Sequence, residues 1–521
     1  MPLKRKKTPH VKSGCRTCKI RRVKCDEQRP SCAKCISSGR KCDGYGIWST
    51  PPVRPPTQQL AYPPRTLPSF SPVEKQYLDR YRNLLTAKLA QPFGSYFWSS
   101  MVLQLSLSET AVLHAAIALT FTHELFMQRR SFNEPFLLQQ YNRAIKALTS
   151  STVSLRVAIV SCVLFLCIEI LRGDPNAMQI HFDSGTRLLR QLQRGNRDCL
   201  VLVKHNPEAF DDHLVDVFAK LNLQFLMLGH ASQQKEAFVP SFHYKDHLQL
   251  LPRFPSVREV QQSINPVLLS VIYLMKEREQ QTLYTDRHPP RPSAAQLQKQ
   301  KVLQCALSDW VASYERSITA LCTSISWTER FGLLLLRVYA DVSTILLATC
   351  FSIKETAYDC HLSLFDSIVN RYQTFHEDEY LPEANNCPAH PFFTTDTCLF
   401  PPLYFTALKC RNQGIRQKAI SLLEEYHHLE GPWTGPMVAA VAKHVVSLEE
   451  KDFKEALQSS TDQSDPGTGI VLPEFCRIHC VECKPDGDSK TSALTLRRFR
   501  HELGEAGGWA IIKSTIALTP E

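Results

Sequence analysis

From Ser71 onward the apolar residues recur at helical spacing. Pro72 stands where the first helix of this region would begin, and proline is favoured in a first helical turn. Between residues 74 and 89 the apolar side chains return every three or four positions, at Tyr77, Leu78, Tyr81, Leu84, Leu85 and Leu89. Such spacing places them on one face, so it predicts an amphipathic helix over 74–89.

Residues 111–127 are apolar on nearly all sides, which is typical of a helix buried at the centre of a domain. Ser106 and Glu109 stand three residues apart just before this segment. That is the spacing of a capping box, in which a serine and a glutamate satisfy backbone N–H groups at a helix start. The sequence therefore predicts a central buried helix that is capped by this pair.

The same periodicity predicts further helices along the chain. They cover about residues 136–149, 154–172, 175–194, 211–229, 263–283, 294–318, 327–353, 360–376, 395–409, 412–429 and 434–452. These segments predict one large all-α regulatory or interaction domain over residues 73–455. Residues 456–521 are expected to form a polar segment and a C-terminal extension.

The segment over residues 46–72 contains eight prolines, and a helix cannot run through them. We interpret it as a Pro-rich linker between the all-α domain and a small unit over residues 11–45. A coiled coil next to that small unit is excluded, because no apolar heptad repeat fits among these prolines. A monomer and a dimer joined through the helical domain both stay open.

The positive charge of the chain is confined to its N-terminus. Residues 1–50 hold 14 Lys and Arg against 3 Asp and Glu, whereas the remaining residues hold 47 of each sign. A small basic unit on a neutral body is typical of a nucleic-acid-binding module. The charge distribution therefore predicts that double-stranded DNA binds the N-terminal unit, with strong salt dependence.

Six cysteines in this basic region have the spacing C-x2-C-x6-C-x6-C-x2-C-x6-C, and they are Cys15, Cys18, Cys25, Cys32, Cys35 and Cys42. A C-x2-C pair directs two thiolates to one metal ion, and the unit occurs twice. Two tetrahedral Zn²⁺ ions need eight ligand bonds, so two of the six thiolates must bridge. Pseudo-symmetry selects Cys15 and Cys32. One zinc would then bind Cys15, Cys18, Cys25 and Cys32, and the other Cys15, Cys32, Cys35 and Cys42.

A disulfide framework or a set of ordinary reduced thiols is the competing interpretation of these cysteines. The other thirteen cysteines of the chain lie mostly inside apolar helical segments, which suits a reducing nuclear or cytosolic compartment. This disfavours disulfides. The sequence thus predicts two zinc ions per chain.

The stretch from Gly14 to Asp43 resembles the Zn2Cys6 binuclear cluster of fungal transcription factors. Stretches of the body such as YNRAIKALTSS and GPWTGPMVAAVAKHVVSLEE resemble the middle region of a fungal transcription-factor family. The resemblance implies a zinc-cluster domain plus a helical regulatory domain. It also implies that the helix of the first C-x2-C unit enters the major groove and reads a CGG triplet.

The distribution of cations within the cluster also indicates that the first C-x2-C unit is the half that contacts DNA. Four of the six residues between Cys18 and Cys25 are basic, whereas the corresponding stretch after Cys35 is basic only at its end. Arg and Lys can donate to both guanine acceptors in the major groove. We expect Arg21 and Arg22 to read bases and the remaining cations to contact phosphates; these are Arg16, Lys19, Lys24 and Lys34. Arg22 stands where the family most often has Lys.

A basic run, Lys4, Arg5, Lys6 and Lys7, precedes the cluster. It is typical of a nuclear localisation signal or a DNA-contacting arm, within a basic tail over residues 1–10. The longest apolar stretch, from Val157 to Leu171, contains Ser161 and Glu169 and is too short to span a bilayer. We therefore expect a nuclear protein that has no membrane partner.

Other candidate sites carry weaker signals. Cys476, His479, Cys480 and Cys483 supply enough ligands for another zinc, although their segment equally fits an alternating strand. His376 with the acidic residues that follow it is a second candidate, for a cation. His114, His123 and Glu169 lie in apolar helices, where packed or hydrogen-bonded roles are expected; Arg172 is a candidate partner for Glu169.

These patterns together predict a nuclear, zinc-dependent, sequence-specific DNA-binding transcription regulator. The sequence has no G-x-S-x-G, P-loop or H-E-x-x-H motif, so we expect no enzyme activity. Transcription machinery or co-regulators are further candidate partners. Two alternatives stay open: an interaction scaffold whose zinc cluster does not read DNA, and a helical receptor that responds to a small molecule.

Overall fold

The computed structural model divides the chain into two compact units, Met1–Pro63 and Pro64–Glu521. The structure describes residues 13–43, 71–90, 92–149, 153–194, 201–202, 209–228, 240–241, 251–283, 291–323, 325–377, 393–394, 399–459, 472–485, 491–500 and 508–517. The basic run at residues 4–7 and most of the Pro-rich linker lie outside these residues.

The N-terminal unit contains two very short helices, α1 (Arg16–Ile20) and α2 (Ala33–Ile36). Its buried core consists of cysteines, with five of the six buried and Cys42 packed against them. Helices of one turn are unstable by themselves, because few backbone hydrogen bonds offset the entropy of ordering. This unit therefore depends on whatever holds its cysteines together.

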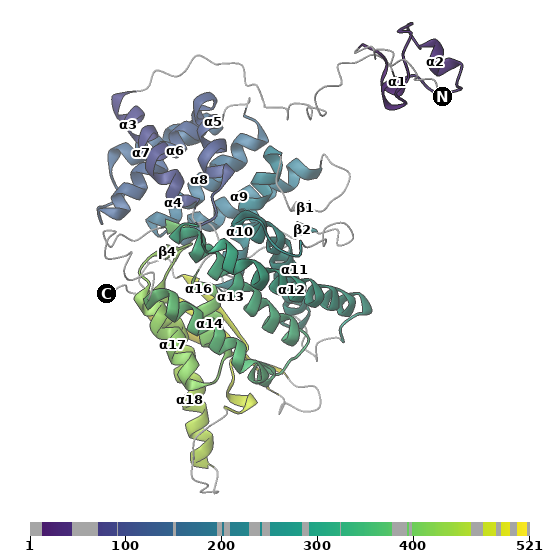
Figure 1. Ribbon diagram of the computed structural model, residues 1–521. Helices are drawn as coiled ribbons and strands as arrows, with labels where there is room; N and C mark the ends of the chain where they lie inside the picture. The colour runs from purple at the N-terminus through teal and green to yellow at the C-terminus, as the bar shows by residue number, and fades with distance from the viewer. Residues whose placement is uncertain are drawn as a thin grey trace. The chain divides into compact units, whose positions relative to one another are not determined.

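The first half of the large unit is a bundle around two helices, α6 and α8 (Figure 1). Both helices are buried on nearly every side, as the apolar sequence of residues 111–127 predicts for α6. Helix α6 packs against α3, α5, α7 and α8, and α8 packs against α9. The helices are α3 (Pro72–Arg80), α4 (Thr86–Leu89), α5 (Val102–Ser108), α6 (Thr110–Met127), α7 (Pro135–Leu148), α8 (Leu155–Arg172) and α9 (Pro175–Arg194), with π-helical turns at Tyr81–Leu85 and Phe97–Met101.

The second half has its own apolar core, in which α11 packs against α12 and α13, and α16 packs against α17 and α18. Figure 1 shows these helices in teal to yellow-green. They are α11 (Val257–Leu283), α12 (Ala294–Leu321), α13 (Trp327–Thr349), a 3-10 helix at Glu355–His361, α14 (Leu362–Phe375), α16 (Phe400–Lys409), α17 (Gln413–Glu425) and α18 (Gly435–Ser459). Helix α10 (Phe210–Met227) instead contributes Leu214, Val217 and Phe218 to the core of the first half.

The C-terminal segment forms a three-stranded antiparallel sheet in the order β6 (Cys480–Pro485), β7 (Thr491–Arg500), β8 (Gly508–Ala517). Leu494 and Leu496 of β7 are buried in the same core as the helices. These strands lie within residues 456–521, for which the sequence predicts a polar segment and a C-terminal extension. Short strands also occur at Val201–Leu202, Pro240–Ser241, Phe393–Thr394, Leu429–Glu430 and Trp433–Thr434.

The structure confirms the predicted helix start near Pro72 but contradicts the predicted capping box before α6. Ser71 caps α3, with Pro72 in the first turn and Glu74 returning the capping-box hydrogen bond. The Ser106 capping box was wrong: the Ser106 hydroxyl donates to the backbone oxygen of Leu103 inside α5, and Glu109 itself is the residue that precedes α6. Helix α5 continues through Ser106, so that side chain is not available at the start of α6.

Two described helices, α6 and α13, are long and apolar enough by composition to cross a membrane. Most of each apolar stretch is buried inside the protein, 67% in α6 and 72% in α13. A helix at the centre of a domain has the same composition, because it contacts apolar neighbours on all sides. We assign both helices to the core.

Candidate metal centre and nucleic-acid interface

The two halves of the N-terminal unit are built alike around a cysteine that precedes each short helix. The Cys15 sulfur accepts the backbone N–H of Cys18 at 3.4 Å, and the Cys32 sulfur accepts that of Cys35 at 3.3 Å. Each first cysteine therefore caps the helix that carries the second cysteine of its pair. This local geometry explains the two-residue spacing, since it directs both sulfurs of a pair to one side.

Four sulfurs, those of Cys15, Cys18, Cys32 and Cys35, lie within 4.8 Å of one another. The Sγ–Sγ distances are 3.6 Å for Cys15–Cys32 and Cys18–Cys32, 3.7 Å for Cys15–Cys35 and 3.9 Å for Cys18–Cys35. A tetrahedral zinc with bonds of about 2.3 Å places its sulfur ligands roughly 3.8 Å apart. The spacing of these side chains fits zinc.

The remaining cysteines surround this group. The Cys25 sulfur accepts the backbone N–H of Cys15 at 3.4 Å and lies within 4.8 Å of the Cys32 sulfur. Cys42 packs against the buried cysteines. Cys15 and Cys32 belong to the central group of four sulfurs, together with Cys18 and Cys35, so these distances do not distinguish bridging from terminal ligands. The assignment of Cys15 and Cys32 as bridges stays a prediction.

Burial raises the pKa values of the Cys15 and Cys18 thiols. Thiolates held close together repel one another unless a cation is bound between them. Binding of Zn²⁺ displaces the thiol protons, so metal binding and folding of the unit are coupled. A donor set of six cysteines is the one that a zinc–thiolate cluster uses.

Helix α1 ends at Ile20, before the two arginines that were predicted to contact DNA bases. Arg21 forms its C-cap, and Arg22 adopts a left-handed conformation with φ of 55°. The backbone N–H of Val23 returns to the Cys18 oxygen at 3.1 Å, which closes the helix end. The chain turns here because Cys25 must come back to the cluster. Arg22 therefore follows the helix instead of lying on it.

The predicted DNA-contacting cations differ in exposure. Arg21 is half-buried, and its Nη1 donates to the Ser38 hydroxyl at 2.9 Å and, at 3.5 Å, to the Lys34 backbone oxygen. Arg21 thereby joins the two halves of the unit. The other five predicted cations are exposed, and they are Arg16, Lys19, Arg22, Lys24 and Lys34.

Asp26, which the sequence analysis did not single out, caps the second half. Its carboxylate accepts the backbone N–H of Ala33 at 2.9 Å and that of Lys34 at 3.3 Å. The hydrogen bond from Ala33 holds the pKa of Asp26 below its ordinary value. A negative group at the start of α2 disfavours phosphate there, which distinguishes this half from the first.

The C-terminal Cys/His candidate does not converge on a common point. Cys476 and Cys483 are buried, with Cys483 in the helical core, while the Cys480 thiol donates to Glu279 Oε1 at 3.5 Å. The His479 Nε2 lies 3.0 Å from the Ile353 oxygen. Within the described residues, groups spaced for a metal ion occur only in the N-terminal unit.

Three of the other polar candidates, His114, Glu169 and His376, have structural partners. His114 Nδ1 lies 2.6 Å from Gln140 Oε1, and Arg172 Nη1 donates to both Glu169 oxygens, at 3.1 and 3.0 Å, as the sequence suggested. Burial lowers the pKa of His123 to about 4, so this histidine is neutral. His376 Nε2 lies 2.8 Å from Glu425; the acidic residues 378 and 379 lie outside the described residues.

Two different family models match the N-terminal unit and the first part of the large unit. Residues 13–50 match the fungal Zn(2)-Cys(6) binuclear cluster domain, and residues 76–253 match the fungal specific transcription factor domain. The chain therefore contains a Zn2Cys6 binuclear cluster domain and a fungal specific transcription factor domain, and the relatives below are named as fungal transcription regulators. The cluster domain binds two zinc ions, in agreement with the cysteine spacing.

Several curated fungal regulators are similar to this Zn2Cys6 protein. The aspercryptin biosynthesis cluster-specific transcription regulator atnN of Emericella nidulans is 34% identical over 248 residues, which cover 41% of this chain and 40% of the relative. The transcription regulator lscL of Purpureocillium lilacinum is 30% identical over 213 residues, which cover 33% of this chain and 48% of the relative. The chain thus spans less than half the length of these relatives. No solved structure matches it.

Proposed function

We propose that this Zn2Cys6 regulator acts in the nucleus as a sequence-specific DNA-binding protein that reads CGG-type triplets with the first half of its cluster. The observation that carries the proposal is the pair of cysteine-capped turns with exposed cations on the first half. Its net charge of +11 over residues 1–50 supplies the attraction to phosphates.

The asymmetry between the halves supports the first as the reader. Arg16, Lys19, Arg22 and Lys24 are exposed around α1, whereas the start of α2 holds the Asp26 carboxylate. DNA phosphates favour the first surface and are repelled by a carboxylate. We therefore assign contact with the major groove to the residues around α1.

Arg22 is the better candidate of the two predicted base readers. It is exposed just beyond the end of α1, so its guanidinium is accessible to the O6 and N7 atoms of a guanine. Arg21 would first have to release its hydrogen bond to Ser38. We propose that Arg22 reads a base and that Arg21 braces the two halves.

A binding assay on the full-length, zinc-loaded protein tests this proposal. Affinity is measured by gel shift for a duplex with a CGG triplet and for the same duplex scrambled. Arg22→Ala should lower the preference for CGG by roughly tenfold or more, since one bidentate contact is worth about 1–3 kcal/mol. Arg40→Ala, an exposed arginine of the second half, is the matched control and should leave the preference unchanged.

Equal binding to the CGG and scrambled duplexes, together with no effect of Arg22→Ala, would contradict the proposal and favour an interaction scaffold. The nuclear assignment is tested separately by replacing the basic run at residues 4–7 with glutamine and imaging the protein in a fungal cell. Light scattering distinguishes a monomer from a dimer formed by the helical domain. We also propose that this protein binds co-regulators of transcription.

A further inference from the structure

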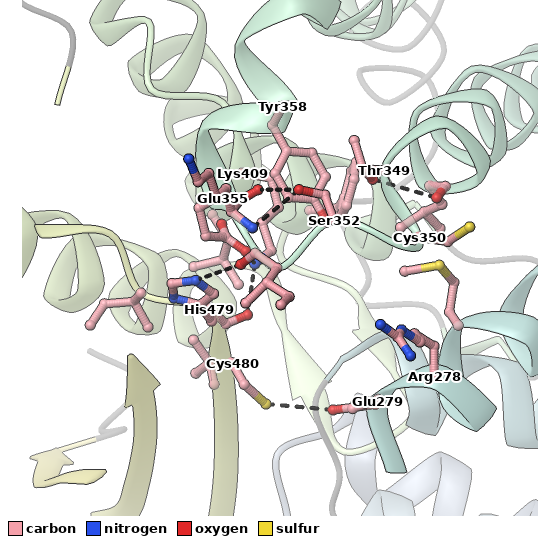
Figure 2. Close-up of a pocket in the computed structure, with 18 of the residues that line it drawn as sticks. Arg278, Glu279, Thr349, Cys350, Ser352, Glu355, Tyr358, Lys409, His479 and Cys480 are labelled. Carbon is pink, nitrogen blue, oxygen red and sulfur yellow. Dashed lines mark hydrogen bonds and ion pairs between the residues drawn. The ribbon is translucent and has the colours of Figure 1, made fainter. Parts of the chain in front are cut away.

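A pocket of about 290 Å³ lies in the second half of the large unit, and His479 and Cys480 of the C-terminal Cys/His candidate form part of its lining. Helix α11, the end of α13, the 3-10 helix at Glu355–His361, α16 and the start of β6 form its walls. Figure 2 shows Arg278 and Glu279 of α11 on one side and Glu355, Lys409 and His479 across from them. Segments far apart in the sequence thus converge on one cavity.

The body of the pocket is apolar. Ile272, Leu346, Phe405 and Leu408 contribute to its lining. Small-molecule sites are typically apolar cavities of roughly 300–1,000 Å³ that contain a few placed polar groups. The volume of this pocket is at the lower end of that range, so it suits a small ligand.

The charged groups of the lining have a positive balance. Four cations, Lys276, Arg278, Lys354 and Lys409, face two carboxylates, Glu279 and Glu355. Such a balance in a partly enclosed apolar site attracts an anion, because the low dielectric strengthens the interaction.

Both carboxylates already have cationic partners. Glu279 accepts a hydrogen bond from Lys276 at 2.6 Å, and Glu355 accepts one from Lys409 at 2.6 Å and one from Arg411 at 2.9 Å. A cationic ligand would have to compete with these internal ion pairs. The carboxylates therefore disfavour a positively charged occupant.

Arg278 is the group best placed to recognise an anion. It is a lining residue with only 6% of its surface exposed, and its guanidinium lies 5.8 Å from the centre of the Phe351 ring. A guanidinium has five N–H donors in a planar fork that matches a carboxylate. A charged donor at the wall of an apolar cavity is chemically suited to an anionic ligand.

We propose that this pocket binds a small monocarboxylate, with the carboxylate on Arg278 and an apolar body against α11, α13 and α16. The wall that β6 contributes means that a bound ligand would touch both the helices and the C-terminal sheet. The inference does not depend on DNA binding by the N-terminal unit.

Isothermal titration of the full-length, zinc-loaded protein tests the site, with octanoate as the probe. Octan-1-ol and octylamine share its apolar body but lack the negative charge. We expect octanoate to bind at one site per chain and to raise the unfolding temperature of the helical unit, and the other two compounds to bind at least about tenfold more weakly.

Two variants and one control locate the binding. Arg278→Met should weaken octanoate binding by about tenfold or more, because a charge-assisted hydrogen bond is lost. Ser352→Trp places a large side chain at an exposed lining position and should block the site without disturbing the core. Arg82→Met removes an exposed arginine of the first half and should leave binding unchanged.

The inference fails if octanoate does not bind, if octylamine binds equally well, or if Arg278→Met and Ser352→Trp both bind octanoate as the unmodified protein does. A poorly folded Arg278→Met protein leaves Ser352→Trp as the deciding variant. These results are independent of the gel-shift assay, so either proposal can fail while the other holds.

Discussion

Arg411 and Glu449 form an ion pair of 2.8 Å in which both side chains are almost completely buried. Arg416 donates to the second Glu449 oxygen at 2.5 Å, and the backbone N–H of Ile478 donates to the first at 2.7 Å. Arg411 also donates to Glu355. This network joins α18 to the loop before α17, to the 3-10 helix and to the chain entering β6, so it attaches the C-terminal sheet to the helical core.

Replacing Glu449 with glutamine should destabilise the helical unit strongly. The change leaves two buried arginines without their shared carboxylate, and breaking a buried pair on one side costs about 3–5 kcal/mol. The free energy of unfolding from urea denaturation measures the loss. Glu455→Gln is the matched control on the same helix, where the pair with Lys451 is largely exposed and is worth about 0–1 kcal/mol. Equal effects of the two changes would contradict a structural role for the network.

Acid should weaken the same unit in a defined pH range. Burial of Glu449 opposes its ionised form, yet Arg411 and Arg416 lower its pKa from 4.5 to about 2. A carboxyl whose pKa is depressed by folding stabilises the folded state above its unfolded pKa and loses that contribution as the pH falls. We therefore expect the free energy of unfolding to fall between pH 4.5 and 2.

Urea denaturation at several pH values measures this decline. Glu474 adds to it: burial opposes its ionisation, but the His479 hydrogen bond and the backbone N–H groups of Thr356 and Glu355 lower its pKa to about 2. Glu449→Gln should flatten the pH dependence by about 2–4 kcal/mol. An unchanged slope in this variant would show that Glu449 is not the titrating group.

Zinc removal should unfold the N-terminal unit and leave the helical unit folded. The core of the small unit consists of cysteines around two one-turn helices, so its folding is coupled to metal binding. Metal analysis should give two zinc ions per chain. Chelation should remove them and abolish DNA binding, while the thermal unfolding of the large unit, followed by circular dichroism, stays the same.

A pair of cysteine variants checks the same point without a chelator. Cys18→Ser removes a sulfur from the central group and should lower the zinc content. Cys305→Ser changes an exposed cysteine of α12 and should keep two zinc ions. Loss of zinc in the second variant but not in the first would overturn the assignment of the ligands.

The salt dependence of DNA binding should report individual phosphate contacts. Lys24 is exposed beyond the turn that ends α1. If it neutralises one phosphate, Lys24→Ala should reduce the slope of log affinity against log salt by about 0.9 and weaken binding to all duplexes alike. Lys418→Ala, an exposed change in α17, should leave the slope unchanged. A normal slope in Lys24→Ala would remove that residue from the interface.

The sequence alone predicted the features whose partners are close in the chain. The cysteine spacing identified the zinc centre because each C-x2-C pair lies within one helical turn. The start of α3 near Pro72 was recognisable for the same reason, whereas the cap formed by Ser71 became visible only in the structure. Helical periodicity likewise located α6 and α8, whose apolar residues indicate burial on all sides.

Tertiary structure decided what depends on residues far apart in sequence. The sheet pairs Cys480 with Arg497, and its strands are stabilised by packing on helices that precede them by many residues. The bond between Arg21 and Ser38 crosses the cluster, so the basic run by itself did not reveal it. The Arg411–Glu449 pair and the pocket at Arg278 form only when distant helices pack, because charge and shape complementarity there are properties of the assembled core.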